Sequence, residues 1–170
     1  MGRAYLLTGR PGVGKTTCVR AVLERVARPA GGFVTEEIRE RGTRVGFALR
    51  TLDGRRATLA RVDRPGAPRV GKYGVDVAAL DRIGVPAIRA AVSEGRLVVI
   101  DEIGKMEMAS AAFCEAVEEA LASPATVLGT ILLASHPWAD RIKAHRAVRI
   151  IALTPSNRDA LPRELADRLR

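Results

Sequence analysis

Cysteine, histidine and aromatic residues are all scarce in this 170-residue chain, and each scarcity argues against a class of protein. The two cysteines, Cys18 and Cys114, lie outside paired motifs, which argues against a disulfide scaffold or a cysteine zinc site. We expect both to be small buried residues. The two histidines, His136 and His145, lack metal-ligand spacing and a third partner, so the sequence does not predict a zinc site.

Long apolar segments are also missing. No apolar run approaches the roughly 20 residues that span a bilayer. The first residues, 1–3, lead directly into an apolar segment, which leaves no room for a signal peptide. The sequence therefore predicts a cytoplasmic protein with no membrane partner.

The net charge is strongly positive, at +9, and it comes from arginine because only four of the 28 basic residues are lysines. Such a field attracts phosphate groups and promotes non-specific adhesion to nucleic acid. The arginines are scattered along the chain, however, and only three Phe, two Tyr and one Trp could stack on bases. We interpret the charge as a solvated surface and expect no specific nucleic-acid partner.

The apolar pattern predicts strands that alternate with helices, without a break that would divide residues 1–170 into two domains. Strands are expected at about 3–8, from 33, and at 96–101, 126–131 and 148–153. Helices are expected at about 15–27, 77–93, 110–122, 137–144 and from 156. We expect the second of these helices to be interrupted near Gly84-Val85-Pro86.

An inserted antiparallel segment is predicted in the first half of the chain. Apolar residues alternate over 44–50 and 56–62, on either side of Asp53-Gly54, which is the pattern of a β-hairpin. The proline- and glycine-rich stretch Pro65-Gly66-Ala67-Pro68 is expected to be a loop.

A phosphate-binding loop lies between the first predicted strand and helix. Strand, glycine-rich loop and helix together direct backbone N–H groups and a helix N-terminus at one anion. Lys15 is expected to contact the β- and γ-phosphates, the Thr16 hydroxyl to bind Mg²⁺, and Thr17 to contact the nucleotide. The loop residues are Gly9, Arg10, Pro11, Gly12, Val13, Gly14, Lys15 and Thr16.

This motif and the alternating elements predict an α/β fold of the P-loop NTPase type. The expected architecture has three layers, with a mainly parallel sheet, helices on both faces and an inserted antiparallel β-hairpin.

An acidic pair, Asp101-Glu102, follows the most uniformly apolar strand. Asp101 is expected to hold Mg²⁺ opposite Thr16, and Glu102 to orient and polarise the water that attacks the γ-phosphate. Capping of a following helix is the competing interpretation of such a pair. The phosphate loop earlier in the chain favours catalysis.

Two neighbouring residues have open interpretations. Thr130 ends the next strand, where its hydroxyl could bind the attacking water or the γ-phosphate, or be satisfied by the local backbone. Lys105 could reach phosphate oxygens or remain solvated.

A guanine-nucleotide switch is not expected. Residues 101–104 fit the Asp-x-x-Gly box of GTPases, but the guanine-specifying Asn-Lys-x-Asp motif is missing. The only asparagine lies in Asn157-Arg158-Asp159.

Several segments together resemble the cancer-related, or thermophile-type, nucleoside-triphosphatase family. They are Gly32-Phe33-Val34-Thr35-Glu36-Glu37-Ile38-Arg39, Gly46-Phe47, Val99-Ile100-Asp101-Glu102-Ile103-Gly104-Lys105-Met106-Glu107, Leu128-Gly129-Thr130-Ile131 and Asn157-Arg158-Asp159. The resemblance implies Mg²⁺-dependent hydrolysis of ATP, GTP, CTP and other nucleoside triphosphates to the diphosphate, with loose base preference.

The resemblance also implies site residues. The second nucleotide-contacting segment would be Asp101, Glu102, Ile103, Gly104 and Lys105. Thr35, Glu36, Glu37 and Arg39 would face the γ-phosphate, with Arg39 either a transition-state cation or part of an ion pair that shapes the loop. Asn157 and Arg158 would lie near the base or the phosphates. The loop after Ile131 departs from the family pattern.

Two alternatives remain open. A small-molecule phosphotransferase, such as a nucleotide or nucleoside kinase, suits the fold and loop, although Glu102 is placed to activate water and no arginine-rich lid is evident. An ATP-gated nucleic-acid factor would exploit the +9 charge. Neither a heptad nor a long apolar stripe indicates assembly, so a monomer is expected.

Overall fold

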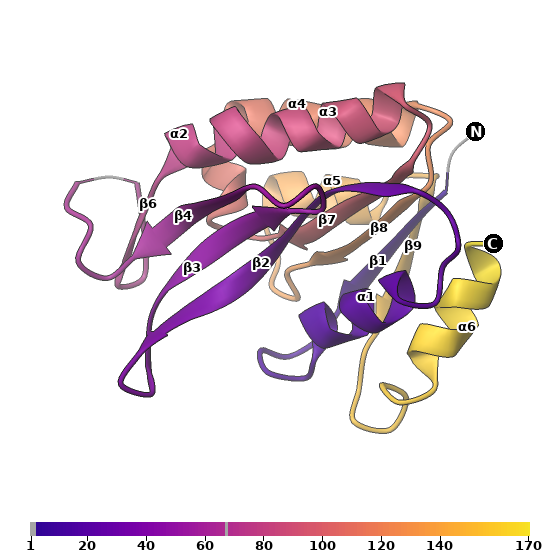
Figure 1. Ribbon diagram of the computed structural model, residues 1–170, viewed down its shortest axis with the longest axis horizontal. Helices are drawn as coiled ribbons and strands as arrows, with labels where there is room; N and C mark the ends of the chain where they lie inside the picture. Colours follow the sequence, from indigo (N-terminus) through magenta and orange to yellow (C-terminus); the bar gives the residue numbers. More distant parts are fainter. Residues whose placement is uncertain (1–2, 67) are drawn as a thin grey trace.

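A computed structural model describes residues 3–66 and 68–170, which form an α/β structure around one nine-stranded sheet (Figure 1). The order of the strands in the sheet is β5-β6-β4-β3-β2-β7-β8-β1-β9. Their bounds are β1 (Ala4–Thr8), β2 (Ala30–Glu40), β3 (Thr43–Thr51), β4 (Arg56–Arg61), β5 (Arg69–Val70), β6 (Tyr73–Val75), β7 (Leu97–Ile103), β8 (Val127–Ile131) and β9 (Val148–Ala152).

The half of the sheet that carries the phosphate loop is parallel. In it β2 pairs with β7, β7 with β8, β8 with β1 and β1 with β9. All five residues of β1 are buried, because helices cover both faces of a parallel sheet. Parallel strands end at the same edge, so the ends of β1, β7 and β8 converge there.

The other half of the sheet is antiparallel and begins where β2 extends beyond its pairing with β7. The β2–β7 register ends at the pair Phe33–Ile100, and β2 continues for seven residues along β3. The predicted hairpin between β3 and β4 is confirmed, although its strands extend the main sheet through β2 rather than forming a separate insertion. Two short strands, β5 and β6, complete this edge and have no counterpart in the sequence prediction.

Helices cover the sheet in two layers, with α3 and α4 above it and α1 and α6 below it in Figure 1. Side chains alternate between the two cores along β1: Leu6 packs on the α3–α4 side, and Tyr5 and Leu7 on the α1–α6 side. The helices are α1 (Lys15–Leu23), α2 (Val77–Ala79), α3 (Val85–Ser93), α4 (Ala111–Ala122), α5 (Pro137–Lys143) and α6 (Leu161–Arg168), with a π-helical turn at Leu80–Gly84 and a 3-10 turn at Glu107–Ala109.

The predicted interruption near Gly84-Val85-Pro86 is a π-helical turn at Leu80–Gly84, through which the backbone stays helical from α2 into α3. The wider turn accommodates Pro86, which lies in the first turn of α3 and has no N–H to donate. The predicted loop at 65–68 is confirmed for the described residues on either side of Ala67, which itself lies outside the described part of the chain.

Three predicted boundaries also move. The strand expected from Phe33 begins at Ala30, and α1 ends at Leu23 rather than near 27 because i→i+3 bonding closes its last turn. The last helix begins at Leu161 rather than Ser156. Asn157 causes that delay, because its side chain bonds the backbone of Thr154 and Ala152 and closes a turn first.

Candidate active site

The phosphate loop connects β1 to α1, as the sequence predicts. Gly12 and Gly14 have φ angles of 80° and 106°, in the left-handed region that favours glycine, and Gly14 is the N-cap of α1. The unpaired N–H groups of the first turn of α1 are therefore available to an anion.

A hollow of about 710 Å³ opens over this turn, and we call it the loop hollow. It is lined from the loop, α1, β2 and the end of β7. Among its lining residues are Gly12, Gly14, Lys15, Thr16, Thr17, Arg20, Thr35, Glu36, Glu37, Asp101 and Glu102.

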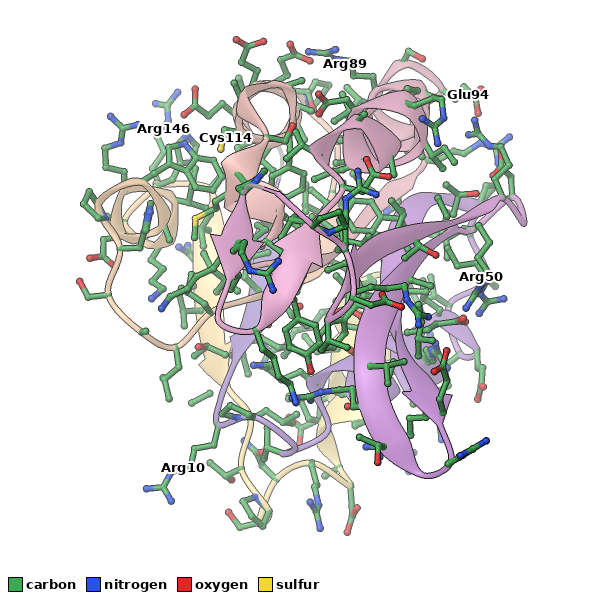
Figure 2. All side chains as sticks on the ribbon, turned by 90° about the vertical axis from the view of Figure 1, so that its left-hand side faces the viewer. Arg10, Arg50, Arg89, Glu94, Cys114 and Arg146 are labelled. Carbon is green, nitrogen blue, oxygen red and sulfur yellow. The ribbon has the colours of Figure 1, made fainter. Side chains whose placement is uncertain are left out.

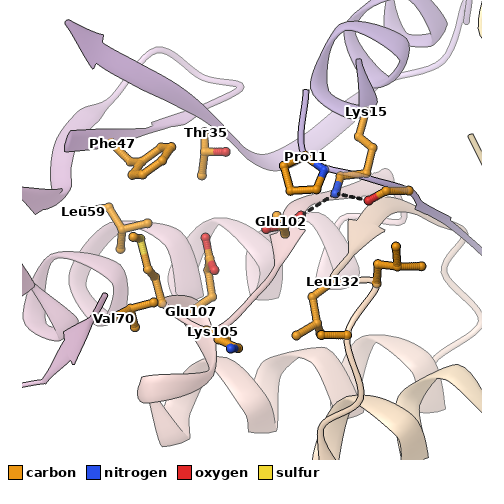
Figure 3. A pocket seen from close by; sticks show the side chains of 14 residues that line it. Pro11, Lys15, Thr35, Phe47, Leu59, Val70, Glu102, Lys105, Glu107 and Leu132 are labelled. Atoms are coloured by element: carbon orange, nitrogen blue, oxygen red, sulfur yellow. Dashed lines mark hydrogen bonds and ion pairs between the residues drawn. The ribbon is translucent and has the colours of Figure 1, made fainter. Parts of the chain in front are cut away.

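Lys15 joins the loop to the acidic strand end. Its Nζ donates to the carbonyl oxygen of Gly9 at 3.1 Å and lies 3.4 Å from Glu102 Oε2 (Figure 3). The Lys15 side chain is 15% exposed and the Glu102 side chain 33%, so the carboxylate reaches solvent while the ammonium is mostly covered. A phosphate group bound by Lys15 would lie beside the Glu102 carboxylate.

Asp101 lies in β7, one residue before Glu102, and is almost completely buried at 1% exposure. Its Oδ1 accepts a hydrogen bond of 2.7 Å from the Thr130 hydroxyl in β8. Burial raises the pKa of the Asp101 carboxyl, and hydrogen bonds from the Thr130 and Thr16 hydroxyls oppose that rise. Its other oxygen, Oδ2, is buried without a hydrogen-bond partner in the described structure.

These residues fit a Mg²⁺ site. A buried carboxylate oxygen without a partner is costly unless a cation or water binds it. Within residues 3–66 and 68–170 there is no cluster of three or more His, Cys, Asp or Glu that could hold a metal alone. Mg²⁺ does not require one, since it commonly takes one or two carboxylates together with phosphates and water. Asp101 and Thr16 are the side chains that would hold it.

A second buried carboxyl, Glu107, lies close to Glu102. The two carboxyl groups approach the same point next to Gly104. If this glycine carried a methyl group, its carbon atom would lie 2.7 Å from Glu102 Oε1 and 2.9 Å from Glu107 Oε2. Burial, followed by the negative charge of Glu102, raises the pKa of Glu107 to about 8. Glu107 is therefore a neutral acid at pH 7, next to a carboxylate.

Comparison with known proteins agrees with this geometry. Residues 4–166 match the NTPase family. The chain is 48% identical to the nucleoside-triphosphatase THEP1 of Thermotoga petrophila over 94% of this chain and 89% of that protein. It is 41% identical to the human cancer-related nucleoside-triphosphatase over 95% of this chain and 93% of the relative.

The fold agrees as well. The crystal structure of THEP1 from the hyperthermophile Aquifex aeolicus matches with a TM-score of 0.91 and 33% identity, covering 98% of this chain and 99% of that one. The chain belongs to the NTPase family. The resemblance predicted from the sequence is therefore confirmed, as is the P-loop NTPase fold.

Arg39 of this NTPase-family chain is not among the described residues that line the loop hollow. Four residues of extended strand separate it from Thr35, a distance of about 13 Å. Its side chain pairs with Glu37 Oε2 at 2.8 Å and donates to the carbonyl of Gly42 at 3.0 Å. Of the two interpretations of Arg39, the structure shows the ion pair, and the role as a transition-state cation stays a prediction.

Thr130 is completely buried, and its hydroxyl donates to Asp101 Oδ1 rather than to the local backbone. Its role toward the attacking water or the γ-phosphate stays a prediction.

The remaining predicted residues divide between the site and its surroundings. Arg158 reaches the loop, since its Nη1 donates to the Val13 carbonyl at 3.4 Å. Asn157 instead closes the turn before α6. Ile103 is buried in β7, while Lys105 is exposed.

Two residues near the loop were missed from the sequence. Arg20 lines the loop hollow from α1 and pairs with Glu36 at 3.3 Å, and helical spacing from Thr16 could have placed it there. No sequence pattern indicated that Glu107 is a buried residue of the site, apart from its place in the segment that resembles the family. Its burial depends on the turn after β7.

Arginines are spread over the surface of this NTPase-family chain. Arg10, Arg50, Arg89 and Arg146 are all exposed and lie on different sides of the molecule in Figure 2. Many arginines pair with acids, such as Arg89 with Glu119 at 2.9 Å.

None of the described helices combines the length and the apolar character that crossing a bilayer requires.

Proposed function

We propose that this protein hydrolyses nucleoside 5′-triphosphates to the diphosphate and phosphate, with Mg²⁺ and with little preference for the base. The observation that carries the proposal is the Glu102 carboxylate 3.4 Å from the Lys15 ammonium, at the point where the phosphate loop meets the end of β7. Membership of the NTPase family and the names of its relatives as nucleoside-triphosphatases support the same conclusion.

Each residue has one task in this proposal. The N–H groups of the loop and of the first turn of α1 bind the phosphates, and Lys15 neutralises charge on the β- and γ-phosphates. Glu102 orients the attacking water and accepts its proton. Asp101 and Thr16 hold Mg²⁺, which neutralises the charge that develops on the phosphate oxygens.

Phosphate release from a panel of triphosphates tests this function directly. We expect steady release from ATP, GTP, CTP and UTP without an added acceptor. Their rates should lie within about tenfold of one another, because one hydrogen bond to the base is enough to produce a tenfold preference and the proposal assigns little recognition of the base. EDTA should abolish release. Release that requires an acceptor, or that proceeds equally well in EDTA, would contradict the proposal.

Replacement of Lys15 by Ala is expected to weaken nucleotide binding roughly 10- to 100-fold, because a charged hydrogen bond to phosphate contributes about 1.5–3 kcal/mol. Titration with a fluorescent ATP analogue measures the change. Lys72→Ala removes the same charge from an exposed residue outside the loop hollow and should bind like the wild type. Equal affinity in the two variants would exclude Lys15 as a phosphate ligand.

A further inference from the structure

A mainly apolar cavity of about 520 Å³ opens beside the site, and hydrolysis does not need it. One water molecule occupies about 30 Å³ of liquid volume, whereas pockets of this size hold small organic ligands. We call it the apolar cavity. Its walls include Phe47 of β3, Leu59 of β4, Val70 of β5 and Leu132 after β8 (Figure 3).

The apolar cavity meets the loop hollow where the γ-phosphate would lie. Lys15, Glu102 and Thr35 line both spaces. The lysine of a phosphate loop contacts the β- and γ-phosphates, so a molecule in the apolar cavity would lie beyond the γ-phosphate and next to Glu102. Phosphoryl transfer requires the attacking oxygen to approach from that side, in line with the leaving group.

The lining of the apolar cavity favours a neutral ligand. No arginine is among its described lining residues, although arginine is the usual ligand of phosphate groups and is abundant in this chain. Two ammonium groups line it, those of Lys15 and Lys105, and the first lies 3.4 Å from the Glu102 carboxylate. The mainly apolar walls and the absence of a guanidinium group from the described lining argue for an acceptor without a phosphate group.

One buried polar group points into the apolar cavity. Glu107 is 4% exposed, and its carboxyl group is directed inward in Figure 3. As a neutral acid at pH 7 it can donate one hydrogen bond to an uncharged ligand. At the rim, Leu133 is 54% exposed, one of only two large apolar side chains that the described chain leaves in solvent. A bound molecule with an apolar body would cover it.

We propose that the apolar cavity binds a neutral alcohol with an aromatic or aliphatic body, and that the protein transfers the γ-phosphoryl group of a nucleoside triphosphate to its hydroxyl group. The alcohol oxygen forms a bond to the γ-phosphorus, and its proton passes to Glu102. The bond between the γ-phosphorus and the β–γ bridging oxygen breaks. The products are a phosphate monoester and a nucleoside diphosphate. This step uses the phosphate site of the proposed function, with the alcohol in place of water.

The probes are 2-naphthylmethanol, benzyl alcohol and 2-methylnaphthalene, which has no hydroxyl. Calorimetry of the whole protein with Mg²⁺ and β,γ-methylene-ATP measures their binding. The naphthyl alcohol should bind about tenfold more tightly than benzyl alcohol, because it buries about 60 Å² more apolar surface. With ATP, ³¹P NMR should show the phosphate ester of each alcohol and none from 2-methylnaphthalene.

Leu133→Asp places a charge at the rim and should weaken binding of the naphthyl alcohol at least about tenfold. Ile150→Asp is the matched control, because Ile150 is the other exposed large apolar residue, 39% exposed, and lies on β9 away from the apolar cavity. It should retain wild-type binding and transfer. Equal binding by both variants would place the alcohol elsewhere and overturn the proposal.

Three other results would overturn it: no saturable binding, displacement of the alcohol by β,γ-methylene-ATP, or binding without ester formation. Phosphate release in the absence of alcohol is measured separately and tests only the proposed hydrolysis. Ester formation without such release would support the transfer while contradicting the hydrolysis.

Discussion

Glu102→Gln is expected to lower the turnover of nucleoside triphosphates on the order of a hundredfold or more. Glutamine retains the size and hydrogen-bonding geometry of the side chain but cannot accept the proton of the attacking water. Nucleotide affinity should be unchanged or higher, because Lys15 loses a carboxylate 3.4 Å away that competes with phosphate. Steady-state phosphate release and titration with a fluorescent ATP analogue measure the two effects separately.

Glu102→Asp is the matched variant, because it keeps the charge and shortens the side chain by one methylene. It should recover part of the lost turnover if the carboxylate accepts a proton. Hydrolysis by Glu102→Gln at the wild-type rate would exclude this assignment. A parallel loss of affinity would instead show that Glu102 organises the loop.

Glu107→Gln is expected to stabilise the protein at alkaline pH by up to about 5 kcal/mol relative to the wild type. The reason is that burial raises the pKa of Glu107 to about 8 in the folded protein, from an ordinary value of 4.5. One pKa unit corresponds to about 1.4 kcal/mol, and the difference between the two values sets the size of the effect.

The direction follows from proton binding. Between pH 4.5 and about 8 the folded state holds the Glu107 proton and the unfolded state does not, so the free energy of unfolding falls as the pH rises. The contribution is fully present below pH 4.5 and is lost once the pH passes the folded-state pKa. Glutamine resembles the neutral acid and has no proton to lose.

Urea unfolding at pH 5, 7 and 9 measures this difference. The wild type should lose stability relative to Glu107→Gln from pH 5 to pH 9, and the two should be similar at pH 5. Glu24→Gln, at an exposed glutamate, should keep the pH dependence of the wild type. Parallel stability curves for the wild type and Glu107→Gln would contradict the buried, neutral state of Glu107.

Local sequence predicted the parallel core well, because its strands and helices carry their own patterns. The apolar runs at β1, β7, β8 and β9 need no distant partner to be recognised, and the glycine loop between β1 and α1 is a contiguous motif. The antiparallel half was predicted less completely. β5 and β6 are two and three residues long, and their pairing depends on β4 rather than on any local pattern.

The sequence could not assign the hydroxyl of Thr130 or the side chain of Arg39. Thr130 and Asp101 are 29 residues apart and meet only because β8 pairs with β7. Arg39 lies four residues from Thr35 in the chain, but an extended strand turns that separation into about 13 Å.

The sequence by itself determined the glycine-rich loop between β1 and α1 and which acids follow the central strand, because both depend on residues that are neighbours in the chain. Tertiary structure decided what surrounds them. It buried Asp101 against Thr130, placed the neutral Glu107 beside Glu102, and formed an open cavity between residues of β3, β4, β5 and the segment after β8. Burial and cavity shape arise from contacts between segments far apart in sequence, and no local pattern encodes them.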